Sequence, residues 1–242
     1  MRTLFALVLL ATTLFAAEKP KLVIITAEDE YKTEVTLPAY SKKYLDAYEV
    51  SFILADPKDK AHLPGLEQLK SADAVVLSVR RKPLLKDDLD EVKAYVASGK
   101  PLVALRTSSH AFALRKPEKL PASVMEWPTF GKDIIGCNYT NHTKQTLGTK
   151  LTVTAKEHPI MKGVPATFES KSGLYLSKPL EKDCVVLLSG TSDKSDEPVA
   201  WVREKSATHG KVAYIALAHE TDFANDVFPV LLTNAIQWAV AK

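Results

Sequence analysis

Short, uninterrupted apolar runs alternate with amphipathic segments along the first half of the sequence, and this alternation restricts the chain to few folds. The runs are rich in Val, Ile and Leu and lack regular polar alternation, so both faces of each strand must be buried. Such strands, separated by helices, form a parallel sheet with helices on each side. We predict strands at 21–26, 50–54, 72–79 and 101–105, with helices at 33–48, 64–70 and 84–98 between them.

The second half of the sequence is less regular. Residues 115–149 contain three prolines and three glycines without clear periodicity, which predicts a long irregular insertion. No repeat and no linker divides the chain, so we expect one α/β domain over residues 18–242. After the insertion we predict four more strands and a closing helix, at 151–155, 184–188, 199–203, 211–217 and 223–240.

The N-terminus has the pattern of a secretory signal peptide. Arg2 precedes an apolar run over residues 4–15, and Ala16-Ala17 stand just before the charged Glu18. An uncleaved anchor is the alternative, but the run is short for a bilayer span. We therefore expect residues 1–17 to be removed, and the protein to be periplasmic or secreted, with no stable membrane insertion afterwards.

Composition and motifs exclude several classes of protein. The formal net charge is +3, and no basic stripe with interleaved aromatic residues is present, so we expect no nucleic-acid partner. The nucleotide-binding patterns GxGxxG and GxxxxGK[ST], the zinc-protease pattern HExxH and the hydrolase pattern GxSxG are all absent. The two cysteines, Cys137 and Cys184, have no CxxC spacing. We interpret Cys184 as a buried residue that opens a strand, and a disulfide stays an open alternative.

Polar residues begin where the predicted strands end. The segment 28–31 (EDEY) follows the first strand, Arg80-Arg81 the third, 106–110 (RTSSH) the fourth, and 219–222 (HETD) the last. Charged residues at a strand end can simply meet solvent. Ligands of open parallel sheets, however, bind beyond the carboxyl ends of the strands. Four polar segments at one edge therefore favour a binding site there.

The residue types in these segments suggest acid–base chemistry. His110 and His219 have the side chain whose ordinary pKa suits proton transfer near neutral pH. His110 could instead serve the fold, as a helix-start residue bonded to a nearby carbonyl. Arginine at 80, 81 and 106 could bind a carboxylate, a phosphate or sugar hydroxyls, or pair internally with residues 28–30. We expect no metal, with a divalent ion at His110, His142 and His219 as the less favoured alternative.

Taken in order, these segments resemble the ThuA-like (trehalose-utilisation) family. The resemblance covers nearly the whole mature chain and implies a single flavodoxin-like, doubly wound, mainly parallel sheet, similar to the class I glutamine amidotransferase domain. It is carried by EDEYKT (28–33), LSVRR (77–81), LRTSSHAF (105–112), GCNY (136–139), HPI (158–160), HETDF (219–223) and NAIQWA (234–239).

The resemblance also implies a loss of glutaminase chemistry. Arg106 stands where class I amidotransferases have their nucleophilic Cys, and a guanidinium cannot act as that nucleophile. The His-x-Glu pair of the amidotransferases is replaced by His219-Glu220-Thr221. A thioester route should therefore be absent. Ser108 or Ser109 with His219 as base is a weaker substitute, because the surrounding pattern is not a nucleophile elbow.

Members of this family are linked to oxidised (3-keto) disaccharides and related glycosides. Bases that remove a proton beside the carbonyl, and cations that stabilise the enolate, would suit such a substrate. The alternatives are a non-catalytic carbohydrate-binding protein and an interaction domain of a larger complex. We predict His110, His219 and Arg106 as catalytic residues; the predicted substrate-binding residues are Glu28, Asp29, Tyr31, Arg80, Arg81, Ser109, Asn138, His142, Glu220 and Asp222.

Overall fold

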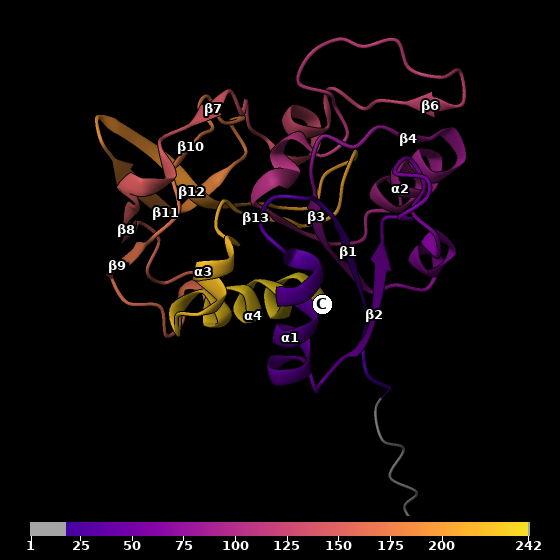
Figure 1. The fold of residues 1–242 in the computed structure, drawn as a ribbon. Helices are drawn as coiled ribbons and strands as arrows, with labels where there is room; N and C mark the ends of the chain where they lie inside the picture. Colours follow the sequence, from indigo (N-terminus) through magenta and orange to yellow (C-terminus); the bar gives the residue numbers. More distant parts are fainter. Residues whose placement is uncertain (1–17, 242) are drawn as a thin grey trace, which may run out of the picture.

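The computed structural model describes residues 18–241, and the predicted signal peptide lies outside the described residues. Nine strands form one mixed sheet in the order β2-β1-β3-β5-β13-β12-β11-β8-β9 (Figure 1). Two further two-stranded pairs, β4 with β6 and β7 with β10, flank the main sheet. The predicted α/β fold with a parallel core is confirmed.

The parallel half of the sheet is the part that the apolar runs predict. β1 lies between β2 and β3, and β5 and β13 continue the parallel arrangement. Nearly every side chain of the inner strands is buried, as expected for a sheet covered on both faces. The bounds are β1 (Lys21–Ala27), β2 (Glu49–Leu54), β3 (Ala74–Val79), β5 (Leu102–Leu105) and β13 (Val212–Ile215).

The other half of the sheet is antiparallel, which the sequence pattern did not indicate. The strand β12 pairs antiparallel with β13, and the remaining strands continue as hairpins and antiparallel neighbours. Residues 193–194 join β11 to β12 in a tight turn, with Asp193 at φ 54°. The bounds are β8 (Thr149–Val153), β9 (Thr167–Ser170), β11 (Val185–Ser192) and β12 (Ser195–Arg203).

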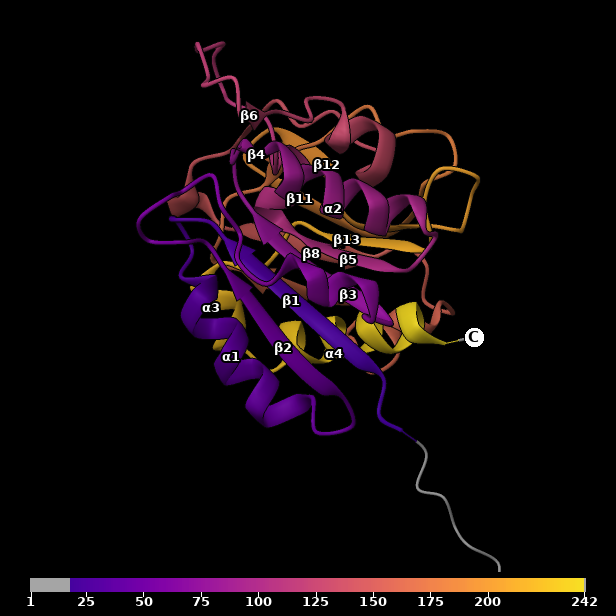
Figure 2. The ribbon, with the colours of Figure 1, turned by 90° about the vertical axis from the view of Figure 1, so that its right-hand side faces the viewer.

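Helices cover both faces of the parallel half (Figure 2). On one face lie α1 (Thr33–Tyr44), α3 (Glu220–Phe223) and α4 (Val227–Val240), and on the other lies α2 (Lys86–Ala97) beside η1 (Leu66–Lys70).

The expected helix at 33–48 ends four residues early. The expected closing helix is split, because the side-chain oxygen of Asn225 accepts hydrogen bonds from the backbone of Val227 and Phe228 and starts α4 there.

The predicted insertion contains only short elements: β6 (Val124–Met125), η3 (Gly131–Ile135), β7 (Asn141–His142) and η4 (Gln145–Leu147). Two further short elements follow it, η5 (Pro159–Met161) and β10 (Tyr175–Leu176), and β4 (Leu84–Leu85) precedes α2.

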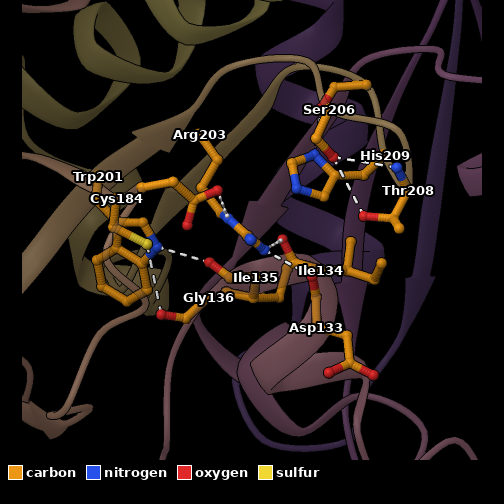
Figure 3. Close-up of polar contacts among 12 residues, drawn as sticks. Asp133, Ile134, Ile135, Gly136, Cys184, Trp201, Arg203, Ser206, Thr208 and His209 are labelled. Atoms are coloured by element: carbon orange, nitrogen blue, oxygen red, sulfur yellow. Dashed lines mark hydrogen bonds and ion pairs between the residues drawn. The ribbon is translucent and has the colours of Figure 1, made fainter.

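Side chains of β12 hold the insertion by its helical turn η3 (Figure 3). The Arg203 guanidinium donates to the carbonyls of Asp133 and Ile134 at 2.6 and 2.9 Å, and the Trp201 indole donates to Ile135 at 2.8 Å. These bonds satisfy carbonyls that a helix end leaves without partners. A cavity of about 520 Å³ lies beside Arg203. The strap that follows, residues 138–142, pairs with β10, and its Asn138 and Thr140 amides donate to the carbonyls of Ser177 and Leu176 at 3.1 and 3.0 Å.

The cysteines are both free thiols in the structure. Burial raises the pKa of Cys137 to about 12 and that of Cys184 to about 11, so neither is a reactive thiolate at neutral pH. Cys184 is half-buried and precedes β11 by one residue. Among the described residues, no helix is long and apolar enough to cross a bilayer.

Candidate functional site at the carboxyl edge of the parallel strands

The carboxyl ends of four parallel strands carry unusual backbone conformations. Of the five non-glycine residues with positive φ in residues 18–241, four follow these strands: Lys32 (56°), Arg81 (44°), Arg106 (35°) and Ala218 (106°). Such conformations are costly for residues with a Cβ and persist where the surrounding structure enforces them, often at functional sites. The edge that the sequence singled out is therefore also where backbone strain gathers.

A small, enclosed polar cavity of about 80 Å³ lies at this edge, which we call the histidine pocket. The loops after β1, β3 and β5 form one side, and the strap 138–142 with β10 forms the other. Its cations outnumber its acids, and Glu30 is already paired with Arg80. The lining residues are Glu30, Arg80, Arg81, His110, Arg115, Tyr139, Thr140, Asn141, His142 and Tyr175.

Ser109 positions the ring of His110. The Ser109 hydroxyl lies 3.2 Å from the Arg106 carbonyl oxygen and 3.1 Å from His110 Nδ1, within hydrogen-bond distance of both. The imidazole stacks on Tyr139 with ring centroids 4.2 Å apart. The Nδ1 atom of His142 donates to the Thr143 carbonyl at 2.8 Å. The histidine pocket thus contains two imidazoles.

The surroundings keep His110 neutral. Burial lowers its pKa to about 2, with further lowering by Arg81 and Arg80. A cationic imidazole is disfavoured there because it would lose water and face guanidinium groups. His110 is therefore a hydrogen-bond acceptor and a base, with no charge of its own at rest.

This lowered pKa predicts a pH dependence of folding stability. An unfolded chain protonates this histidine near pH 6.5, whereas the folded protein does not, so acid favours the unfolded state. We expect His110 to make the free energy of unfolding about 2 kcal/mol smaller at pH 5 than at pH 8. Urea unfolding at pH 5 and pH 8 would measure the two free energies of unfolding. In the His110→Gln variant, the difference between them should be smaller by about 2 kcal/mol. The same difference in the variant as in wild type would contradict this prediction.

Arg106 lies beneath the histidine pocket rather than in it. Its guanidinium is buried between the rings of Tyr31 and Tyr175, at 4.6 and 4.4 Å from their centroids. Its Nη1 donates to the Ala216 carbonyl at 2.8 Å, and its Nη2 to the Gly173 carbonyl at 3.3 Å. In this arrangement Arg106 fixes the two tyrosines, and with them the floor of the pocket.

His219 lies on the far side of this tyrosine–arginine stack. It caps the short helix α3, where its Nδ1 accepts from the Thr221 backbone at 3.2 Å. Its ring faces Tyr31 with centroids 5.4 Å apart and does not line the histidine pocket. Burial lowers its pKa, and Arg106 adds to the lowering. The structure therefore brings His142, and not His219, beside His110.

Other predicted residues hold the loops that shape the site. The Glu28 carboxylate accepts bonds from the backbone of Glu30, Tyr31 and Thr33 at 2.7–3.0 Å. Buried Asp222 accepts from the backbone of Ala218 and His219 at 3.1 and 3.0 Å, which shapes the turn after β13.

Three more predicted residues lie outside the pocket. Glu220 forms an exposed ion pair with Lys32 at 2.7 Å, and Asn138 is exposed on the strap. Asp29 lines a neighbouring cavity.

Sequence reasoning missed Arg115, Tyr139 and Tyr175. Tyr139 is next to a predicted residue, but nothing local distinguishes it from a core tyrosine. Tyr175 comes from β10, far along the chain. Within residues 18–241, no cluster of three or more His, Cys, Asp or Glu side chains is arranged to hold a metal ion.

Solved structures with the same fold come from several organisms. A ThuA-like protein from Bacteroides uniformis has a TM-score of 0.69 at 21% identity, with 96% of each chain covered. One from Parabacteroides merdae has a TM-score of 0.63 at 15% identity, covering 93% of this chain and 91% of that one. A GMP synthase component from Thermoplasma acidophilum has a TM-score of 0.56 at 11% identity, covering 92% and 97%.

The last similarity places the fold among class I glutamine amidotransferase-like structures. A search of curated proteins gives no significant match. The model of the ThuA family, described as trehalose utilisation, matches residues 21–239. The chain therefore belongs to the ThuA family.

Proposed function

We propose that the protein is an exported enzyme of carbohydrate catabolism that acts on oxidised (3-keto) glycosides or disaccharides. The observation that carries this proposal is the histidine pocket, where two imidazoles line the same cavity as three arginines. Family membership supports the carbohydrate context. Bases beside cationic donors are what enolisation of a ketone needs.

The proposed step removes a proton from the carbon next to the substrate carbonyl. His110 or His142 accepts the proton at Nε2, and the electron pair moves to the carbonyl oxygen. Arg81 stabilises the enolate that forms. Burial keeps His110 neutral at rest, and Arg81 and Arg80 add to this effect. The negative charge of the enolate would stabilise the imidazolium that forms beside it. Collapse of the enolate then either expels the substituent on the neighbouring carbon, whose oxygen takes the proton back from the imidazolium, or returns that proton to another carbon of the sugar.

Glutamine hydrolysis is not part of this proposal. Arg106 follows β5 directly, with positive φ, where the related amidotransferases have their nucleophile. Its guanidinium is buried and cannot attack a carbonyl. Buried Ser108 donates to the Leu77 carbonyl at 2.8 Å, and Ser109 is bonded to His110, so neither hydroxyl faces His219 as a substitute pair.

The experiment is to incubate the purified protein with native and 3-keto disaccharides in D₂O and to follow the sugars by NMR. We expect deuterium to enter beside the keto group, followed by product, and native sugars to stay unchanged. Saturable sugar binding without exchange or product would instead favour the carbohydrate-binding alternative. Neither exchange nor binding, with and without added Mg²⁺ or Mn²⁺, would reject the keto-sugar assignment.

A further inference from the structure

A second cavity, of about 400 Å³, adjoins the histidine pocket, and we call it the lysine cavity. The two cavities share Arg80 and Arg81 in their linings. The histidine pocket alone has room for roughly six water molecules, which suits a carbonyl and its neighbouring carbons but not a whole sugar. A glycoside whose keto group reached His110 would therefore extend into the lysine cavity.

Lys82 is the unusual residue of the lysine cavity. Its side chain lines the cavity, yet only 8% of the residue is exposed. Its backbone amide donates to the Ala111 carbonyl at 2.7 Å, which fixes the residue against the loop after β5. Among residues 18–241, no carboxylate lies within ion-pair distance of its ammonium group.

The ammonium group of Lys82 faces the cavity rather than open solvent. It therefore loses part of its hydration and gains no ion-pair attraction in return. Burial accordingly lowers the pKa of Lys82, with Asp29 opposing this and Lys60 adding to it. Arg81 repeats the pattern, because it has no ion-pair partner in the described part of the chain and burial lowers its pKa as well.

The rest of the lysine cavity suits a small organic ligand. Leu114, Leu120 and Val124 supply apolar wall, against which the C–H faces of a sugar can pack. Lys60, at the exposed rim, adds a positive charge, and Asp29 and Asp59 are the acids of the lining. Asp59 already accepts the backbone amide of Ala61 at 3.0 Å. The unmatched charge of the cavity is positive.

We propose that the lysine cavity binds an anionic group of the substrate, and that Lys82 and Arg81 are the residues that hold it. The ligand class is an acidic carbohydrate, with a carboxylate or phosphate in the lysine cavity and its reacting carbonyl in the histidine pocket. The inference rests on the proposed function only in taking the ligand to be a carbohydrate. In this proposal Lys82 determines the specificity for an anionic over a neutral sugar.

The test is isothermal titration calorimetry of the purified protein at low ionic strength, with glucose, glucuronate and glucose 6-phosphate as probes. We expect glucuronate or the phosphate to bind at least tenfold more tightly than glucose. Whichever anion binds more tightly identifies the group as a carboxylate or a phosphate. Equal affinities for all three probes, or no binding of either anion, would overturn the proposal.

Lys82→Met is expected to abolish the preference for the anionic probe. Lys58→Met is the matched control, because Lys58 is an exposed lysine on the same loop as Lys60 and lies outside the lining of both cavities. We also expect Lys82→Met to raise the Tm of the unliganded protein, since a partly desolvated charge without an ion-pair partner is removed. An unchanged preference in this variant would overturn the role of Lys82.

A folding defect in the Lys82 variant would show as a lowered Tm. The wild-type measurement keeps the proposal testable in that case, because glucuronate or glucose 6-phosphate should raise the Tm of wild type and glucose should not. The binding readout is independent of turnover. Loss of keto-sugar turnover with retained anion binding would reject the proposed reaction alone, and the reverse result would reject the anionic subsite alone.

Discussion

Arg106→Ala is expected to lower the free energy of unfolding by about 3–5 kcal/mol. The substitution removes a guanidinium from between two tyrosine rings and leaves the carbonyls of Gly173 and Ala216 without their donor. It also leaves a cavity beneath the histidine pocket. Urea unfolding followed by tryptophan fluorescence would measure the loss, with Arg115→Ala, an exposed arginine, as a control expected to change stability little.

Arg106→Met separates the loss of hydrogen bonds from the cavity left by the missing side chain. Methionine fills much of the volume but donates no hydrogen bonds, so we expect it to restore only part of the stability. A loss below about 1 kcal/mol in Arg106→Ala would show that the tyrosine–arginine stack does not support the fold.

His110→Ala is expected to reduce kcat on a keto-sugar substrate by about 10²–10⁴-fold, the usual effect of removing a group that transfers a proton. Because the imidazole also stacks on Tyr139, KM should rise as well, but less than kcat falls. Steady-state kinetics would give both values, and circular dichroism would confirm that the variant is folded. His158→Ala, remote from the pocket beside Trp238, is the matched control.

The same assay distinguishes the histidines at the strand ends. We expect His219→Ala to lose much less activity than His110→Ala, because Tyr31 separates it from the histidine pocket. Equal losses in the two variants would instead support the role for His219 that the sequence suggested. Full activity in His110→Ala would remove His110 from the mechanism.

Local sequence patterns predicted the parallel half of the sheet well. The strands β1, β3 and β5 are apolar on both faces, and this feature is visible in the residues themselves. Strand direction is not visible there, since antiparallel β11 and β12 contain similar apolar stretches. Their direction depends on the tight turn at residues 193–194 and on pairing with β13, which are properties of the assembled sheet.

The candidate site was also predictable only in part: the sequence indicated which residues reach the sheet edge, but not which of them share a cavity. Arg80 and Arg81 directly follow β3, and His110 ends the short helical turn after β5, so their position at the edge of the sheet follows from chain connectivity. His219 follows a buried strand in the same way, yet the side chains of Tyr31 and Arg106 stand between it and the pocket. A pattern of strand ends cannot show such a barrier, because it is formed by packing between segments distant in sequence.

The sequence by itself thus determined the fold class, the family and the sheet edge that carries the candidate site, because the buried strands and the motifs after them are local features of the chain. Only the tertiary structure decided which side chains share a cavity. The pairing of the strap with β10 brings Tyr139, His142 and Tyr175 to the cavity that His110 lines. The packing of the loops after β3 and β5 also leaves Lys82 with little exposed surface and without an ion-pair partner among the described residues, and the sequence pattern does not indicate this.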